Sequence, residues 1–227
     1  MKRLLLLTLG LTMICGAKAQ EEKLEIKPSG RILLDGGLFK ADGQDDKFND
    51  GFAIPDMRVG FSASYGAWKA KVDMGYAYGK VNMKDVFVQY NFDKEAADFL
   101  RAGYFIHQFG LQSATSSSFK ISMEEPASNQ AFNNSRMIGL MYQHTRSKFL
   151  GTLSFFTESD AMKMTSDKLG NQGVGMMTRL VYKPFCEPGK IFHVGLSGAF
   201  ETPRYSSDKE LSHHSYTLST TFPTRMM

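Results

Sequence analysis

The chain has 227 residues, with 27 basic and 23 acidic side chains and a hydrophobic fraction of 42%. Removing Lys2, Arg3 and Lys18, which lie close to the N-terminus, leaves 24 basic residues, so the rest of the chain is almost neutral. Because a nucleic-acid-binding protein needs a clustered excess of positive charge, the composition argues against a nucleic-acid partner.

Residues 1–19 indicate a cleavable secretory signal peptide. Two basic residues precede the apolar run Leu4–Ile14, and the small residues that end at Ala19 suit cleavage. The apolar run is shorter than the roughly 20 residues of a membrane-spanning helix, and no later stretch approaches that length. Any insertion into a membrane should therefore use strands.

Residues 20–30 are expected to form an N-terminal periplasmic segment, and residues 31–227 a β-barrel domain. In the barrel domain, runs of about ten residues alternate apolar side chains with polar or small ones, which is typical of strands with two different faces. In the clearest run, Val72 and Tyr76 share one face and Asp73 lies on the other. Helical signals are weak, and only residues 94–98 indicate a short helical turn. The predicted strands are 31–40, 56–65, 67–78, 83–92, 98–109, 136–144, 148–157, 173–183, 190–200 and 214–222.

The connections between these strands alternate in length, except for a short link at 79–81. Outer-membrane barrels combine short periplasmic turns with long extracellular loops, and they carry aromatic residues near the strand ends. The short links lie near Gly66, 93–97, Arg146 and 184–189, and the long ones at 41–55, 110–135, 158–172 and 201–213. The aromatic residues near strand ends are Trp68, Tyr76, Tyr78, Tyr90, Phe92, Tyr182 and Phe200. We therefore predict an all-β protein, a transmembrane antiparallel β-barrel in the outer membrane of a Gram-negative bacterium.

Four consecutive segments resemble the phosphate-selective porin O and P family: Met57–Gly79, Val81–Phe92, Leu100–Ser118 and Phe119–Phe132. The resemblance implies a porin barrel of about sixteen strands, so ten readable strands suggest a chain truncated at its C-terminus. It also implies a homotrimer that lets small anions such as phosphate diffuse. The chain departs from the family pattern at Arg58, where paired arginines are common, and around Gln108.

If lipid faces the apolar side of each strand, five cations face the interior, namely Arg58, Lys69, Lys71, Arg101 and Arg179. They outnumber the inward-facing Asp73 and Asp85. Charges on a narrow aqueous wall lower the barrier to ions of opposite sign, so we predict a weakly anion-selective pore. The alternative is that these cations pair with the aspartates across strands and merely fill the interior.

The longest predicted loop, 110–135, contains hydroxyl groups at 115–118 and the ammonium group of Lys120, which together suit an oxyanion. Its apolar residues, including Phe119 and Phe132, would let it pack inside the barrel and narrow the channel. A solvated surface loop is the alternative.

No metal, cofactor or catalytic site is expected. Only Cys186 remains after cleavage, and the acidic residues at 42–50 lack the spacing of a calcium loop. No Gly-x-Ser-x-Gly or His-Glu-x-x-His motif is present, although spacing alone leaves open a barrel lipase whose serine and histidine meet in space. The expected partners are outer-membrane lipid, lipopolysaccharide and small anions. The alternative function is a non-conducting barrel with a structural or adhesive role.

Overall fold

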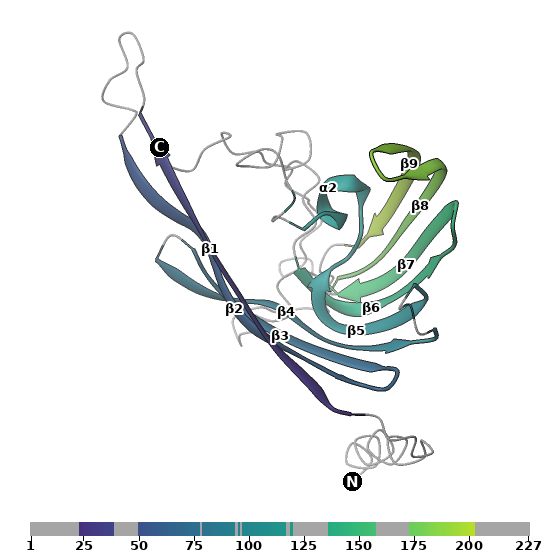
Figure 1. Ribbon diagram of the computed structural model, residues 1–227, viewed down its shortest axis with the longest axis horizontal. Helices are drawn as coiled ribbons and strands as arrows, with labels where there is room; N and C mark the ends of the chain where they lie inside the picture. The colour runs from purple at the N-terminus through teal and green to yellow at the C-terminus, as the bar shows by residue number, and fades with distance from the viewer. Residues whose placement is uncertain are drawn as a thin grey trace, which may run out of the picture.

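The computed structural model describes residues 23–38, 50–77, 79–93, 95, 97–116, 119, 136–157 and 173–202. Nine strands form one curved antiparallel sheet, in which each strand pairs with its neighbours in the chain (Figure 1). Within the described residues, β1 and β9 are the two edges of the sheet, so the sheet is open. The strands are β1 (Glu25–Gly37), β2 (Gly51–Tyr65), β3 (Trp68–Ala77), β4 (Lys80–Asn91), β5 (Phe99–Ile106), β6 (Arg136–Thr145), β7 (Phe149–Thr157), β8 (Val174–Glu187) and β9 (Lys190–Glu201).

The predicted all-β class and nine of the ten predicted strands are confirmed. The tenth, 214–222, and the predicted signal peptide, 1–19, lie outside the described residues. Strand β1 begins at Glu25 instead of residue 31, so it takes in part of the segment that was expected to precede the barrel. Strand β2 likewise begins at Gly51, inside a predicted loop, and β8 continues to Glu187.

These strands extend through prolines that lie outside the predicted strand ranges. A proline has no N–H group for the ladder, so it is tolerated at an edge or where the pairing is irregular. Pro28 lies in the edge strand β1. Pro55 and Pro184 lie where the pairing register shifts, opposite β1 and β9 respectively. The register shifts thus explain why both strands are longer than predicted.

The two faces of the sheet differ in chemistry as the alternation predicts. On β3, Val72, Met74 and Tyr76 are exposed on the outer face, whereas Lys69 and Asp73 are more covered on the other. Exposed large apolar side chains recur on every strand except β5. The outer face is therefore an apolar surface without a covering layer in the described part of the chain.

Aromatic side chains form a band on the outer face near the short turns. Trp68 and Tyr90 pack edge to face with their ring centroids 5.0 Å apart, and Tyr90 contacts Phe92 in the same manner. Phe149 and Tyr182 continue the band on β7 and β8. Such a band suits the interface between hydrocarbon and water, where aromatic rings anchor outer-membrane barrels. Tyr78, which was expected to take part, lies outside the described residues.

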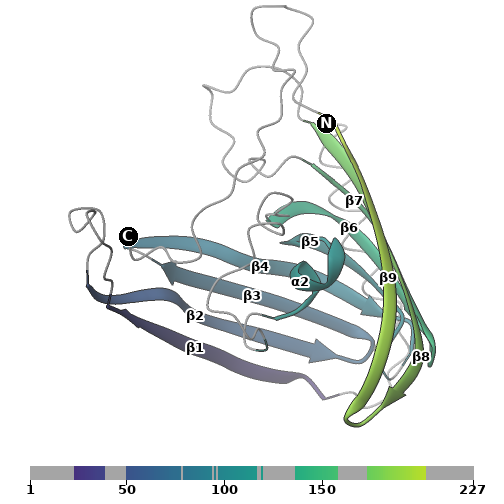
Figure 2. The same cartoon turned by 90° about the horizontal axis from the view of Figure 1, so that it is seen from above.

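The concave side of the sheet holds a short helix. The helix α2 (Gly110–Ala114) follows β5 and lies inside the curve of the sheet (Figure 2). The Gly110 amide donates a 3.0 Å hydrogen bond to the Ser197 hydroxyl oxygen on β9, which ties the start of this segment to the far side of the sheet. Among the described residues, no helix is both long and apolar enough to cross a membrane.

The helical turn predicted at 94–98 is described only in part, because residues 94 and 96 lie outside the described residues. Glu95 lies in a turn and Asp98 at a bend, and the Asp93 carboxylate accepts hydrogen bonds from the Ala97 and Asp98 amides. A helix forms at Gly110–Ala114, where the sequence predicted a loop.

Asp98 links two neighbouring turns at the end of the sheet where the connections are short. Its carboxylate accepts a 2.8 Å hydrogen bond from the Thr145 amide and a 2.9 Å bond from Arg146 Nη1, and it lies 3.0 Å from His144 Nδ1. The Thr145 amide and, after it, the Arg146 guanidinium hold the pKa of Asp98 below its ordinary value of 3.8. The ionised carboxylate therefore stabilises the fold.

We expect Asp98→Asn to lower the urea midpoint of unfolding at pH 7 in the detergent-refolded protein. Because the folded pKa of Asp98 is depressed, its stabilisation is present above pH 3.8 and is lost as the pH falls through the folded pKa. The difference from the wild type should therefore vanish in strong acid. Fluorescence of Trp68, the single tryptophan, reports unfolding.

Glu187→Gln serves as the control. Glu187 is an exposed carboxylate at the end of β8, before another short turn, so its substitution should leave the midpoint unchanged. An equal loss of stability for Asp98→Asn at neutral and acidic pH would contradict the assigned role.

Candidate functional site

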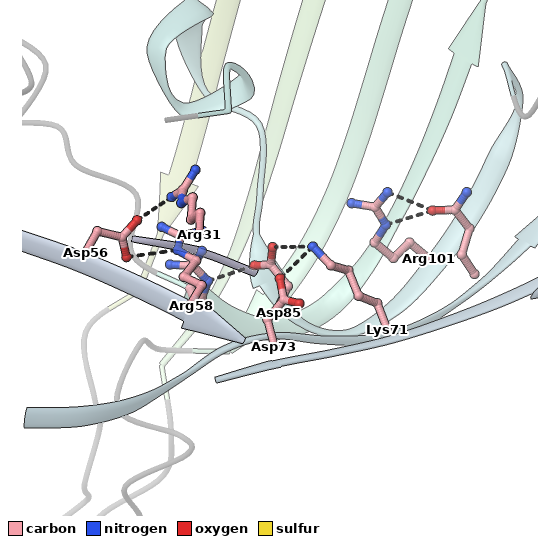
Figure 3. A network of polar contacts seen from close by, with 9 residues as sticks. Arg31, Asp56, Arg58, Lys71, Asp73, Asp85 and Arg101 are labelled. Atoms are coloured by element: carbon pink, nitrogen blue, oxygen red, sulfur yellow. Dashed lines mark hydrogen bonds and ion pairs between the residues drawn. The ribbon is translucent and has the colours of Figure 1, made fainter. Parts of the chain in front are cut away.

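The inner face of the sheet carries the charged side chains that alternation predicts. Arg58 lies on β2, Lys69 and Lys71 on β3, Arg101 on β5 and Arg179 on β8, all on this face. Figure 3 shows Arg58, Lys71 and Arg101 projecting from the same side of the sheet, toward the space that contains α2. Lys120, the sixth predicted residue, lies outside the described residues.

Small residues make room for these side chains. A Cβ atom at Gly60 would lie 1.9 Å from Asp73 Oδ1, so only glycine lets that carboxylate lie across β2. Gly103 has a φ of 139°, and a Cβ there would lie 2.3 Å from the Val86 carbonyl oxygen. Glycine at 103 therefore permits the close approach of β4 and β5 beside Arg101.

Arg58 belongs to an ion-paired group at the edge of the sheet. Its Nε donates a 2.9 Å hydrogen bond to Asp56 Oδ1, and Arg31 on β1 contacts the other oxygen of the same carboxylate (Figure 3). These side chains are only 12–23% exposed. Asp56 thus neutralises much of the positive charge that Arg58 brings to the inner face.

Lys71 belongs to a second ion-paired group that joins three strands. Its Nζ lies 2.6 Å from Asp73 Oδ2 and 3.7 Å from Asp85 Oδ2 (Figure 3). Asp85 Oδ1 in turn accepts a 2.7 Å hydrogen bond from Arg136 Nε, at the start of β6. Pairing with Asp73 and Asp85 was the alternative interpretation of the sequence, and the geometry of Lys71 agrees with it, whereas Arg58 pairs with Asp56 on its own strand.

Arg101 is held differently, by an uncharged side chain and by aromatic rings. Its Nε and Nη2 donate hydrogen bonds of 2.9 and 2.7 Å to the same Gln89 Oε1 atom. The guanidinium carbon lies 4.1 Å from the centroid of the Phe87 ring, and within 5.4 Å of those of Phe99 and Phe105. Cation–π attraction therefore adds to the hydrogen bonds without cancelling the charge.

Arg179 has a similar environment on β8. Its Nη1 donates a 3.2 Å hydrogen bond to Gln108 Oε1, and Gln108 Nε2 donates to Gln143 Oε1 at 3.3 Å. Thr152, directly opposite Arg179 in the register, has a buried hydroxyl group without a hydrogen bond in the described part of the chain. Gln108, in the segment after β5, is thus the hydrogen-bond partner of this guanidinium group within the described residues.

Lys69 is surrounded by other cations. The charged groups that act on it are those of Arg101, Lys71 and Lys27, and no described carboxylate pairs with it. Three of the predicted cations, Lys69, Arg101 and Arg179, therefore have no carboxylate partner among the described residues. These three side chains therefore add positive charge to the inner face that no described carboxylate cancels.

The sequence missed several inward-facing polar residues. Strict alternation places Lys84 on the outer face, but a register shift opposite Val72 and Met74 turns it inward, across Gly75. Arg31 and Arg136 were also missed, because each is the first residue of its predicted strand, where alternation gives little signal; in the structure Arg31 lies in the middle of β1. The importance of Gln89 could not be found from the sequence, since it depends on Arg101 lying beside it on the next strand.

Part of the inner face is apolar. Phe87, Phe99, Phe105 and Met141 form a buried cluster on β4, β5 and β6. The fully buried His107 ring lies between the rings of Phe105 and Phe156. His107 belongs to the short segment that connects β5 to α2. This packing fixes where the segment after β5 turns inward.

The beginning of the predicted constriction loop lies on this side of the sheet. Of the predicted hydroxyl groups, that of Thr115 donates a 2.8 Å hydrogen bond to the Leu111 carbonyl oxygen in α2. Ser117 and Ser118 lie outside the described residues. Within the described ranges, no group of three or more His, Cys, Asp or Glu side chains is placed to hold a metal ion.

Residues 26–225 match the family model described as phosphate-selective porin O and P. The match covers every strand of the sheet apart from the first residue of β1. No curated protein and no solved structure matches the chain.

We expect Asp85→Asn to lower the free energy of unfolding by about 1–3 kcal/mol, because it leaves the largely covered Arg136 without its carboxylate. Urea unfolding followed by Trp68 fluorescence measures the change. Glu25→Gln is the matched control, since the Lys27–Glu25 ion pair is well exposed and should contribute little. Equal effects of the two substitutions would contradict a structural role for the Asp85 pair.

Proposed function

Because the chain belongs to the phosphate-selective porin O and P family, we propose that it forms an aqueous channel for the diffusion of small anions such as phosphate. Membership places the protein in the outer membrane of Gram-negative bacteria as a porin. Porins are generally channels and not enzymes. The anion preference is the part of the proposal that requires support from the inner face.

The observation that carries the proposal is the charge on the inner face. Lys69, Arg101 and Arg179 have no carboxylate partner among the described residues, whereas each inward aspartate named above, Asp56, Asp73 and Asp85, contacts at least one cation. A wall with excess positive charge raises the local concentration of anions and lowers their barrier to passage. The geometry therefore supports anion selectivity more strongly than a count of charges does.

The outer face supports contact with outer-membrane lipid. Its exposed apolar side chains would lie in the hydrocarbon region, and the aromatic band around Trp68 and Tyr90 would lie at the interface. A homotrimer, which the family resemblance implies, and contact with lipopolysaccharide are further parts of the proposal.

The proposal predicts an anion-directed reversal potential for the refolded protein in a planar bilayer under a potassium chloride gradient. Arg101→Ala should lower the ratio of chloride to potassium permeability by roughly two- to fivefold, since one uncompensated charge is lost from the wall. Phosphate added to the bath should reduce the chloride current. Arg101→Lys, which keeps the charge, is the control and should retain most of the selectivity.

Folded protein that forms no channels would contradict the proposal. It would favour the non-conducting structural or adhesive role, which the apolar cluster of Phe87, Phe99, Phe105 and Met141 on the inner face would then fit. A cation-directed reversal potential would support the channel but contradict its anion preference.

A further inference from the structure

The cations of the inner face have two kinds of partner. Arg58 and Lys71 contact carboxylates, at 2.9 and 2.6 Å. Arg101 and Arg179 contact the amide oxygens of Gln89 and Gln108. The difference matters because a carboxylate cancels the charge of a cation, whereas an amide orients the cation and leaves its charge unchanged.

The amide of Gln89 is well placed for this purpose. Gln89 is 4% exposed, and its Nε2 donates a 2.6 Å hydrogen bond to Asn91 Oδ1, which fixes the direction of Oε1. Register pairing sets Gln89 directly opposite Arg101 on the neighbouring strand. The position of the guanidinium group is thus determined from both strands.

Arg101 also retains unused hydrogen-bond donors. An arginine has five N–H donors, and two of those of Arg101 bind Gln89. The remaining three find no acceptor among the described residues. The Phe87 ring covers one face of the guanidinium plane at 4.1 Å, so the free donors and the uncancelled charge are available to a solute anion.

We propose that Gln89 is a specificity-determining residue. It orients the Arg101 guanidinium group without cancelling its positive charge, so that Arg101 can attract and bind passing anions. Gln108 likewise binds Arg179 through an amide oxygen, although Arg179 is more deeply buried. This inference deepens the proposed channel function and depends on it. It implies that the amide-bound arginines, and not the carboxylate-bound Arg58 and Lys71, give the wall its selectivity.

The test is Gln89→Glu in the full refolded protein, which changes shape very little and places a carboxylate against Arg101. A bidentate ion pair should form and cancel the guanidinium charge. We expect the ratio of chloride to potassium permeability to fall about fivefold, the factor for one unit charge about 4 Å away in water. The concentration of inorganic phosphate that halves the chloride current should rise by about the same factor.

Asn82→Asp is the matched control. It makes the same chemical change on the same strand, opposite Gly75, but Asn82 is exposed and its side chain donates a hydrogen bond to the Lys80 carbonyl oxygen. We expect it to alter both quantities by less than about twofold, because water screens the added charge. Gln108→Glu, beside Arg179, repeats the main test at the second arginine if Gln89→Glu fails to fold.

The outcomes separate the inference from the proposed function. A wild-type channel that is anion-selective, with a large loss in Gln89→Glu and a small one in Asn82→Asp, supports the inference. Equal effects of the two variants, or no effect of Gln89→Glu, in an anion-selective channel would overturn the inference and leave the proposed function intact. A wild-type protein without channels or without anion selectivity would overturn both.

Discussion

Antiparallel pairing between neighbouring strands is the constraint on which the rest of the structure depends. In hydrocarbon every backbone N–H and C=O group needs a partner within the protein, and the ladders from β1 to β9 supply these partners from one strand to the next. Pairing also fixes which side chains share a face, because the side-chain period of a strand is two. The apolar outer face, the aromatic band and the charged inner face all follow from this register.

The register also determines how the charges of the inner face are compensated. Ion pairs form diagonally between adjacent strands, as Lys71 does with Asp85, and between residues two apart on one strand, as Lys71 does with Asp73. Arg101 meets Gln89 for the same reason, since the two are paired across β4 and β5. The identity of one cross-strand neighbour, carboxylate or amide, therefore decides whether a cation is cancelled or remains available to solutes.

The strands and their two faces could be predicted from the sequence, because alternation of period two is a local signal. Residues 67–78 show it clearly, and β3 occupies almost the same range. Strand bounds were less accurate at Pro55 and Pro184, which fell in predicted connections, since register shifts that admit a proline depend on the neighbouring strand. The inward turn of Lys84 was missed for the same reason.

The candidate site could be predicted only in part. The inward placement of Arg58, Lys69, Lys71, Arg101 and Arg179 followed from periodicity, but their partners did not, because cross-strand contacts need the register. Lys71 and Arg101 look equivalent in the sequence, yet one contacts two aspartates and the other a glutamine. Tertiary pairing, which no local pattern encodes, makes the difference between them.

The central claim is that one face of the sheet contacts lipid and the other contacts water. Labelling with a charged, membrane-impermeant thiol reagent tests it most directly, in protein refolded into lipid vesicles with the exposed Cys186 replaced by serine. We predict that Lys71→Cys reacts and that Val72→Cys, one residue away, does not. Reaction of Val72→Cys together with protection of Lys71→Cys would contradict the assignment of the two faces.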